Sequence, residues 1–328
     1  MTMKQGVAFP ILRVVGGAIF VLAGVIAYTG ITLGVAAALV LVIGGAAVLV
    51  IALVGHRPRA FDIAVFIISL LVLGGVSAGY TAGPTVVTYS ATRAQLHSSV
   101  ISLTVSASTG SVSVGFTNRT DLAYQVKFTN PLWFSPPGGT GVDSVTNSTA
   151  NGTFNLNVGA AWSAVSVLLG RGYLLDVKVT TGTGSVSLVA PRNQALRNIS
   201  LYSSTGSVSA QMDSLAITGL VLRADTGSVS LVSGNLGAAG QRVPVTLTAS
   251  TGSIDMRVSL AAQDAVSLTA STGLGSISQS LNGFTVTQNS RTNLVATAGD
   301  ISTAPRSFVI SATASLGSVN LNANFVSG

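Results

Sequence analysis

The sequence predicts an all-β fold of the single-stranded β-solenoid (β-helix) type, preceded by three transmembrane α-helices. Two observations lead to this prediction. Residues 1–84 contain three long apolar runs, and residues 85–328 repeat a short Gly-Ser-Val-Ser phrase at a nearly constant spacing. Only 8% of the residues are charged, against about 25% in typical soluble proteins, and the mean hydropathy is +0.64. We therefore expect a membrane anchor over 1–84 and a solenoid domain over 85–328.

Three apolar runs form the predicted anchor: Val14–Tyr28, Ile31–Val54 and Ile63–Ala78. Each approaches the roughly 20 residues that a helix needs to span a bilayer. The first run also resembles a signal peptide, but residues 27–29 are a poor cleavage site and two further runs follow. No ionisable residue stands in the middle of a run, so we expect anchoring rather than transport.

Four cationic residues set the expected orientation of the anchor. Lys4 and Arg13 precede the first run, and Arg57 and Arg59 lie between the second and the third. Cationic loops tend to stay in the cytoplasm. The N-terminus is therefore expected in the cytoplasm and the solenoid outside it, in a multi-pass protein of the cell membrane.

Two Gly-xxx-Gly pairs fall in the anchor, Gly30 with Gly34 and Gly75 with Gly79. Small residues at this spacing allow membrane helices to approach closely, so these four are candidate positions for helix packing. The alternative is that they reflect the general frequency of Gly in membrane helices.

One phrase recurs through the second domain, and its clearest copies read Ser-Thr-Gly-Ser-Val-Ser or a close variant. Counted between their glycines, the later copies are spaced by 22, 21, 25, 23, 24 and 18 residues. A period near 22 is typical of a solenoid. The expected turn glycines are Gly110, Gly184, Gly206, Gly227, Gly252, Gly275, Gly299 and Gly317.

Each repeat combines a turn with short strands. Glycine supplies the positive φ of a tight turn, and the Ser-Val-Ser-Leu that follows alternates with the period of a β-strand. Val, Ile and Leu should face inward, so a coil buries its apolar side chains only against neighbouring coils. At about 22 residues per coil and a step of about 4.8 Å, residues 85–328 predict about eleven coils in a rod roughly 50 Å long.

The repeated Gly-Ser/Asp-Val/Ile-x-Leu phrase, over roughly residues 100–328, resembles that of the putative-adhesin family of β-solenoid domains. Related toastrack domains occur in bacterial envelope-stress modules, often beside membrane helices. The resemblance implies the fold of this part of the chain. The family has no established active site, so the resemblance implies no catalytic residue. The three apolar runs are not part of the match.

Residues 117–180 lack a clean copy of the phrase. Within them, 130–152 begins with a stretch rich in Pro and Gly, which excludes a central strand and predicts a protruding loop. The loop carries Trp133 and Phe134, and Trp162 follows it. Exposed aromatic residues often anchor partners, so these three are candidate partner-binding residues. The alternative is that Trp133 and Phe134 cap the first coils.

Composition argues against most catalytic chemistry. The chain has no Cys and two His, and its 9 acidic residues are all Asp. The triplet 225–227 matches an aspartic protease, but that chemistry needs two such Asp residues. Residues 75–79 match a nucleophile elbow but end an apolar run. We therefore expect no enzyme, no cofactor and no metal site, with an acidic edge that binds Ca²⁺ as the alternative to solvated Asp residues. The 16 cationic residues are spread thinly, which predicts no nucleic-acid binding.

These features favour a non-catalytic, membrane-anchored cell-surface protein whose solenoid is an adhesion module or a structural stalk. The expected partners are the lipid bilayer and either a second copy or an envelope or surface component. One alternative is an envelope-sensing or signalling protein that acts through its membrane helices. Another is a bactofilin-like polymer on the inner membrane face, favoured by the C-terminal run Val319–Val326, which lacks an obvious polar cap.

Overall fold

The computed structural model describes residues 85–130, 143–213, 217–238 and 242–326. Apart from Thr85 and Asn130, these residues belong to one compact unit, which we call the β unit. Within the described ranges, no helix has the length and apolar character needed to cross a bilayer. The three predicted transmembrane runs lie outside those ranges, and so do the candidate residues Gly30, Gly34, Gly75, Gly79, Trp133 and Phe134.

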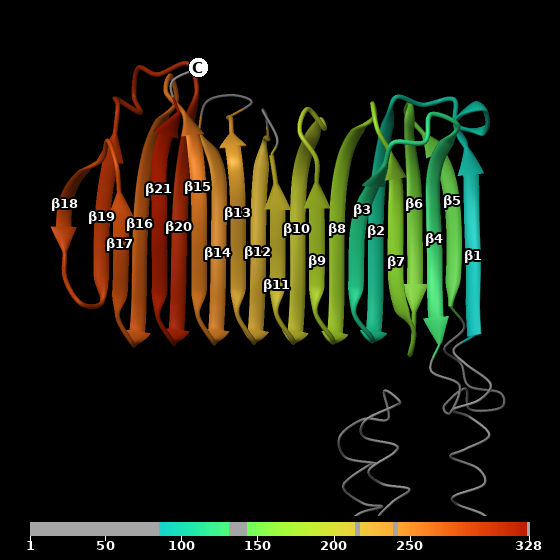
Figure 1. Cartoon of the computed structure of the whole chain (residues 1–328), viewed down its shortest axis with the longest axis horizontal. Helices are drawn as coiled ribbons and strands as arrows, with labels where there is room; N and C mark the ends of the chain where they lie inside the picture. The colour runs from blue at the N-terminus through green and yellow to red at the C-terminus, as the bar shows by residue number, and fades with distance from the viewer. Residues whose placement is uncertain (1–84, 131–142, 214–216, 239–241, 327–328) are drawn as a thin grey trace, which may run out of the picture. The chain divides into compact units, whose positions relative to one another are not determined.

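The prediction of an all-β fold is confirmed for the described chain, which forms two large sheets and one short 3₁₀ turn, η1 (Arg93–Gln95). Figure 1 shows the strands side by side in one long row. In spatial order, sheet A contains β1 (Thr85–Thr92), β4 (Leu122–Asn130), β7 (Ala164–Gly170), β3 (Val112–Thr117), β9 (Val186–Ala190), β11 (Val208–Met212), β13 (Val229–Leu236), β15 (Ile254–Ala261), β21 (Val319–Val326) and β17 (Ile277–Leu281). Sheet B contains β18 (Thr285–Asn289), β19 (Asn293–Ala298), β16 (Ala265–Leu274), β20 (Ser307–Leu316), β14 (Val243–Thr251), β12 (Gly219–Thr226), β10 (Leu196–Thr205), β8 (Leu174–Thr183), β2 (Val100–Thr109), β6 (Thr153–Ala160) and β5 (Ser144–Ala150).

The repeat unit of the fold is a strand in sheet B, a tight turn, and a strand in sheet A. Neighbouring repeats pair in parallel and in register. Val208 of β11, for example, lies between Val186 of β9 and Val229 of β13. Sixteen of the strands form eight such repeats, fewer than the expected eleven coils. The other five strands, β1, β4, β5, β18 and β19, flank them at the two ends of the row.

The order of the repeats in space differs from their order in the chain. The repeat β2–β3 lies between β6–β7 and β8–β9, although β6–β7 follows it in sequence. At the other end, the last repeat, β20–β21, is inserted between β14–β15 and β16–β17. The C-terminal strand is therefore paired on both sides. This strand needs no polar cap because it does not lie at an end of the row. The missing cap therefore no longer favours a polymer.

The prediction of a protruding loop over 130–152 is wrong for the residues from 144 onward. Residues Ser144–Ala150 form β5, which pairs antiparallel with β6 through a tight turn at Asn151 and Gly152. The Pro- and Gly-rich stretch that suggested a loop ends before this strand begins. β5 is Ser/Thr-rich and mostly exposed, so it lacks the apolar alternation by which the central strands are recognised.

The core lies between the two sheets and is built from aligned columns of apolar side chains. Along β10, Ile199 and Leu201 point inward, and Ser200 between them is partly exposed. Leu201 stacks between Val179 of β8 and Leu222 of β12. Full burial of such a side chain is worth about 1.5–3 kcal/mol. Each repeat therefore depends on both of its neighbours for stability.

Candidate functional site

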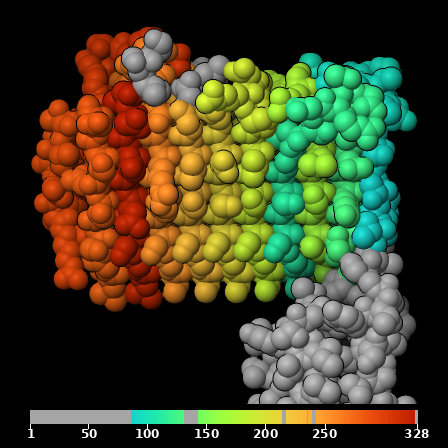
Figure 2. Space-filling model, in the orientation of Figure 1, coloured from blue at the N-terminus to red at the C-terminus, as the bar shows by residue number. Residues whose placement is uncertain are grey.

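The turns that join sheet B to sheet A form a straight line along one edge of the β unit, which we call the corner row. It appears as the lower edge of the strands in Figure 1, and Figure 2 shows it as an even lower rim. In spatial order, the row consists of residues 161–163, 109–111, 183–185, 205–207, 226–228, 251–253, 316–318 and 274–276.

Backbone hydrogen bonds join each turn of the corner row to the next. The Gly206 N–H donates to the carbonyl oxygen of Thr226 at 2.7 Å, and the Val208 N–H donates to that of Ser228 at 2.9 Å. A Cβ on Gly206, which has φ +142°, would lie 2.3 Å from the carbonyl oxygen of Gly184. Only glycine fits such a close approach.

The predicted turn glycines therefore have a structural role. Seven of them, Gly110, Gly184, Gly206, Gly227, Gly252, Gly317 and Gly275, stack in the corner row, each with a positive φ. Gly299 does not belong to it. This glycine follows β19 at the opposite ends of the strands, and a Cβ on it would meet Ala265 rather than another glycine.

Trp162, the predicted partner-binding residue inside the described ranges, lies in the corner row. It stands in the turn between β6 and β7, and its side chain is 52% exposed. The carbonyl oxygen of Ala161 accepts a hydrogen bond from the Thr109 N–H at 3.0 Å, and the Val165 N–H donates to Ser111 at 2.9 Å. The turn that carries Trp162 is thus fixed against the first glycine turn.

The charged side chains of sheet B are confined to three adjacent strands. The adjacent strands β8, β10 and β12 carry five charged residues, and none of the other eight described strands of this sheet carries any. Their charged and polar side chains alternate with the buried residues and so point outward. We call this group the charged cluster: Asp176, Lys178, Arg197, Asn198, Tyr202, Arg223 and Asp225.

One half of the charged cluster is built around Asp225. The Tyr202 hydroxyl donates to its carboxylate at 2.6 Å, and the Arg223 guanidinium pairs with it at 2.9 Å. The same guanidinium lies 5.5 Å from the centre of the Tyr202 ring. The hydrogen bond from Tyr202, and then that from Arg223, lowers the pKa of Asp225 below its ordinary value. All three side chains are held in defined positions on a flat sheet.

The other half is built around Asp176. The Arg197 Nε donates to its carboxylate at 2.9 Å, and the Asn198 amide nitrogen and side chain each donate at 3.2 Å. The bond from Arg197, and then that from the Asn198 backbone, lowers the pKa of Asp176 below its ordinary value. Lys178 is exposed two residues further along β8, on the same outward face. The cluster thus carries one ammonium group beside two internally neutralised pairs.

The sequence reasoning missed this cluster because partners on adjacent strands lie 21 to 23 residues apart, as Asp176 does from Arg197 and Tyr202 from Asp225. In a linear reading they are isolated polar residues. Aligning the repeats on their glycines would have found them, because residues one period apart become neighbours on adjacent strands.

Among the described residues, no group of three His or Asp side chains is close enough to hold a metal ion together, so the alternative of an acidic edge that binds Ca²⁺ gains no support. Six of the described Asp residues form ion pairs with Arg. The other two, Asp143 and Asp300, accept hydrogen bonds from Ser163 and Ser302. Each carboxylate is thus engaged by the chain itself.

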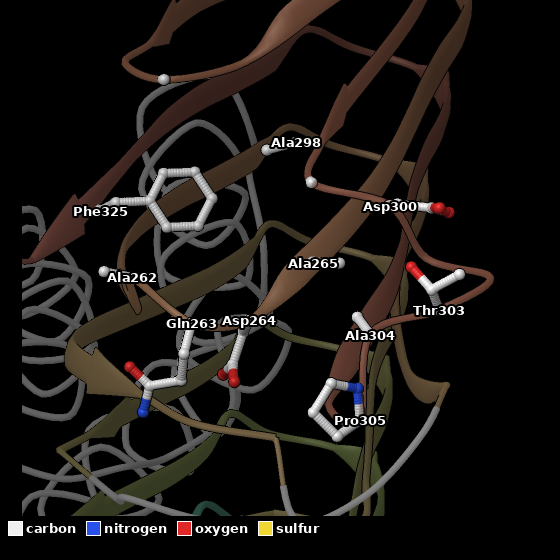
Figure 3. Close-up of a pocket in the computed structure, with 12 residues that line it drawn as sticks. Ala262, Gln263, Asp264, Ala265, Ala298, Asp300, Thr303, Ala304, Pro305 and Phe325 are labelled. Atoms are coloured by element: carbon white, nitrogen blue, oxygen red, sulfur yellow. The ribbon is translucent and has the colours of Figure 1, made fainter.

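A hollow of about 480 Å³ lies at the strand ends opposite the corner row, between the β15–β16 turn and the segment after β19 (Figure 3). Asp264 in its lining is buried and pairs with Arg306 at 2.9 Å. Asp300 accepts a hydrogen bond from the Ser302 hydroxyl at 2.6 Å, and this bond lowers the pKa of Asp300. Both acids are occupied, so the hollow does not present the paired carboxylates of an acid–base site.

Comparison with known proteins gives distant structural likenesses. No family model matches the sequence, and no curated protein matches it. A putative cell adhesion protein from Clostridium sporogenes is similar at 13% identity and a TM-score of 0.45, over 73% of this chain and 99% of that one. A putative adhesin from Bacteroides fragilis is similar at 11% identity and a TM-score of 0.28, over 73% of this chain and 97% of that one. Likenesses this distant assign neither protein's role to this chain.

Proposed function

We propose that this protein is a non-catalytic module of the cell surface. Its residues 1–84 anchor it in the cell membrane, and the stacked repeats form a β-solenoid outside the cytoplasm. The solenoid serves adhesion, and it binds an envelope or surface component through the charged cluster. The apolar runs of the sequence support the anchor, and the parallel, in-register repeats support the solenoid.

The observation that carries the binding role is the concentration of charge on β8, β10 and β12. The other described strands of sheet B carry no charged side chain, so charge is not required to keep their exposed face hydrated. Charges needed for solubility would be spread along the sheet. Five charges and a tyrosine on three adjacent strands indicate recognition, because Arg and Tyr are the residues most enriched where partners bind.

The geometry of the cluster suits an extended polar partner such as a surface glycan. Its side chains are fixed by ion pairs and hydrogen bonds, so little conformational entropy is lost on binding. The ion-paired groups retain hydrogen-bonding capacity toward hydroxyl groups, and Lys178 offers an ammonium group. The three strands lie about 4.8 Å apart, so the cluster extends across the sheet as well as along its strands.

A matched pair of variants tests the binding role. Arg223 pairs with Asp225, two residues away, at 2.9 Å, and Arg257 on sheet A pairs with Asp255 in the same way at 2.9 Å. Arg223→Ala should reduce the binding of the full chain to whole cells or a glycan array by about 10-fold or more. Arg257→Ala removes the same kind of surface pair and should leave binding unchanged. Equal effects of the two variants would refute a role for the cluster.

The membrane topology has its own test. Protease treatment of intact cells should cleave the region after residue 84 if it lies outside. Protection of that region until the cells are lysed would contradict the proposed location, provided that a known surface protein is cleaved in the same sample.

A further inference from the structure

The corner row carries the most conspicuous apolar side chains on the surface of the β unit. Among the described residues, the exposed Leu and Trp side chains are Trp162, Leu274, which is 70% exposed, and Leu316, which is 47% exposed. Leu274 and Leu316 are paired neighbours at one end of the row, and Trp162 is at the other end. In the five repeats between, the residue aligned with these leucines is threonine: Thr109, Thr183, Thr205, Thr226 and Thr251.

Leucine in place of threonine at an outward position is unfavourable when that position faces only water. The two leucines are adjacent, so they form one exposed apolar patch and not two isolated side chains, and contiguous apolar surface is what distinguishes contact sites. The positions do not require leucine for folding, because the other repeats form the same turn with threonine.

The corner row is also free of charge, and the opposite edge is not. No charged residue occurs in the eight turns of the row. At its two extremities, Asp143 is bonded to Ser163, and the backbone of Arg291 is bonded to Ile277. The described turns at the opposite edge contain Arg119, Asp121, Arg171, Arg192, Asp213, Arg242, Asp264, Asp300 and Arg306. The turns of the corner row themselves thus carry no charge to desolvate, and the pairs Arg223–Asp225 and Arg257–Asp255 lie behind them on the outer faces of the sheets.

The chain enters the β unit at this same edge. β4 ends opposite the start of β7, which is at the corner row. The Arg93 N–H, just after β1, donates to Asp121, just before β4, at 2.8 Å, so β1 runs antiparallel to β4. β1 therefore begins at the corner-row edge, as Figure 1 shows.

We infer that the corner row is a lipid-contacting edge. Trp162 and the pair Leu274 and Leu316 enter the bilayer surface, and the Thr and Ser hydroxyls between them stay in the hydrated headgroup layer. Tryptophan is the residue that favours this interface most. The inference rests on the proposed membrane anchor, and it replaces a projecting stalk with a solenoid that lies along the membrane. The eight turns span about 34 Å at the strand spacing.

Two single-cysteine variants of the full chain test the inference, since the natural chain contains no Cys. Leu316 and Val309 lie on the same strand, β20, near opposite ends, and are 47% and 41% exposed. Each variant, Leu316→Cys or Val309→Cys, is labelled with a fluorophore and reconstituted into vesicles of lipids brominated on the acyl chains. We expect the label at 316 to be quenched several-fold more strongly than the label at 309, with unchanged circular dichroism in both.

Each other outcome separates the inference from the proposed anchor. Equal quenching at 316 and 309, or quenching at neither in a chain that resists alkaline extraction, overturns the lipid-contacting edge and leaves the anchor intact. Release of the chain by alkaline extraction overturns both. Energy transfer between labels at 316, lost on dilution into excess lipid, assigns the leucine patch to a second copy and overturns the lipid contact. The double variant Leu274→Thr, Leu316→Thr should fold normally, because it restores the residue of the other repeats.

Discussion

Replacing Gly227 by Ala tests whether the corner row holds adjacent repeats together. Gly227 has φ +137°, and a Cβ on it would lie 2.3 Å from the carbonyl oxygen of Gly206. An L-residue in such a backbone conformation costs about 1–3 kcal/mol. Relief of the contact requires the repeats to separate by roughly 1 Å, which weakens two hydrogen bonds worth about 1 kcal/mol each. They run from Gly206 N to Thr226 O at 2.7 Å and from Val208 N to Ser228 O at 2.9 Å. The expected loss is about 3–5 kcal/mol of the free energy of unfolding.

Urea unfolding of the full chain, followed by the circular dichroism of its strands, measures this loss. The control is Gly152→Ala, because Gly152 also has a positive φ, +72°, but a Cβ there meets no heavy atom within 4 Å. The control should lose about 1–2 kcal/mol, the cost of the left-handed conformation alone. If Gly227→Ala lost no more than Gly152→Ala, the close approach of the turns would not be a source of stability and the reasoning would be refuted.

Three further substitutions test the interior and the charged cluster. The buried Ser233 hydroxyl has no hydrogen-bond partner among the described residues, so Ser233→Ala should leave the free energy of unfolding unchanged or raise it by about 1 kcal/mol; a loss on urea unfolding would contradict this. Arg306→Met leaves the fully buried Asp264 carboxylate without its ion-pair partner and should lower the free energy of unfolding by about 3–5 kcal/mol at neutral pH. A urea-unfolding midpoint equal to that of the natural chain would count against a stabilising role of the pair. Tyr202→Phe removes the hydrogen bond from the Tyr202 hydroxyl that lowers the pKa of Asp225, so the pKa of Asp225 should rise toward its ordinary value. An unchanged Asp225 pKa in an NMR pH titration would disprove the contact.

The sequence predicts the central repeats well because one local rule governs all of them. Each glycine with φ between +124° and +154° in the corner row is preceded by Thr or Leu and followed by Ser. The turn is fixed by glycine, and the strand by the alternation of Val with Ser. The positions of the inward residues follow from these two features. Gly299 shows the limit of the rule, since its neighbours match the phrase only in part and it lies in an unrelated turn.

The order of the repeats in space could not be predicted from the same rule. Nothing in the local phrase distinguishes β20–β21 from a repeat at the end of the row, because the glycine turn is the same in every repeat. The insertion depends on the segment from Asn282 to Arg306, which carries β18 and β19 outward and back. Such a path is set by long-range pairing, and local sequence does not encode it.

The charged cluster could not be predicted from the order of residues along the chain, for a related reason. Asp176 and Arg197 are each unremarkable in their own repeat, and their pairing depends on the register between β8 and β10, which shifts between Leu196 and Ile199. That irregularity brings Asn198 to the same carboxylate. A period counted from glycine to glycine predicts which strands are adjacent, but it does not predict this shift in register between them.

The two ends of the row bear on whether copies stack into a polymer. A further copy would have to continue the parallel register, in which each turn bonds to the glycine turn beside it. On sheet B, the outermost strands β5 and β18 instead pair antiparallel with their neighbours. At the β5 end, an approaching repeat would thus meet a strand of the opposite direction. At the other end, β18 is antiparallel to β19 and so runs parallel to β16, but it has no glycine turn to which a repeat could bond. Both strands are also short and rich in polar side chains, a composition that limits edge-to-edge pairing. The antiparallel strands at both ends of sheet B therefore disfavour the addition of a further repeat to that sheet.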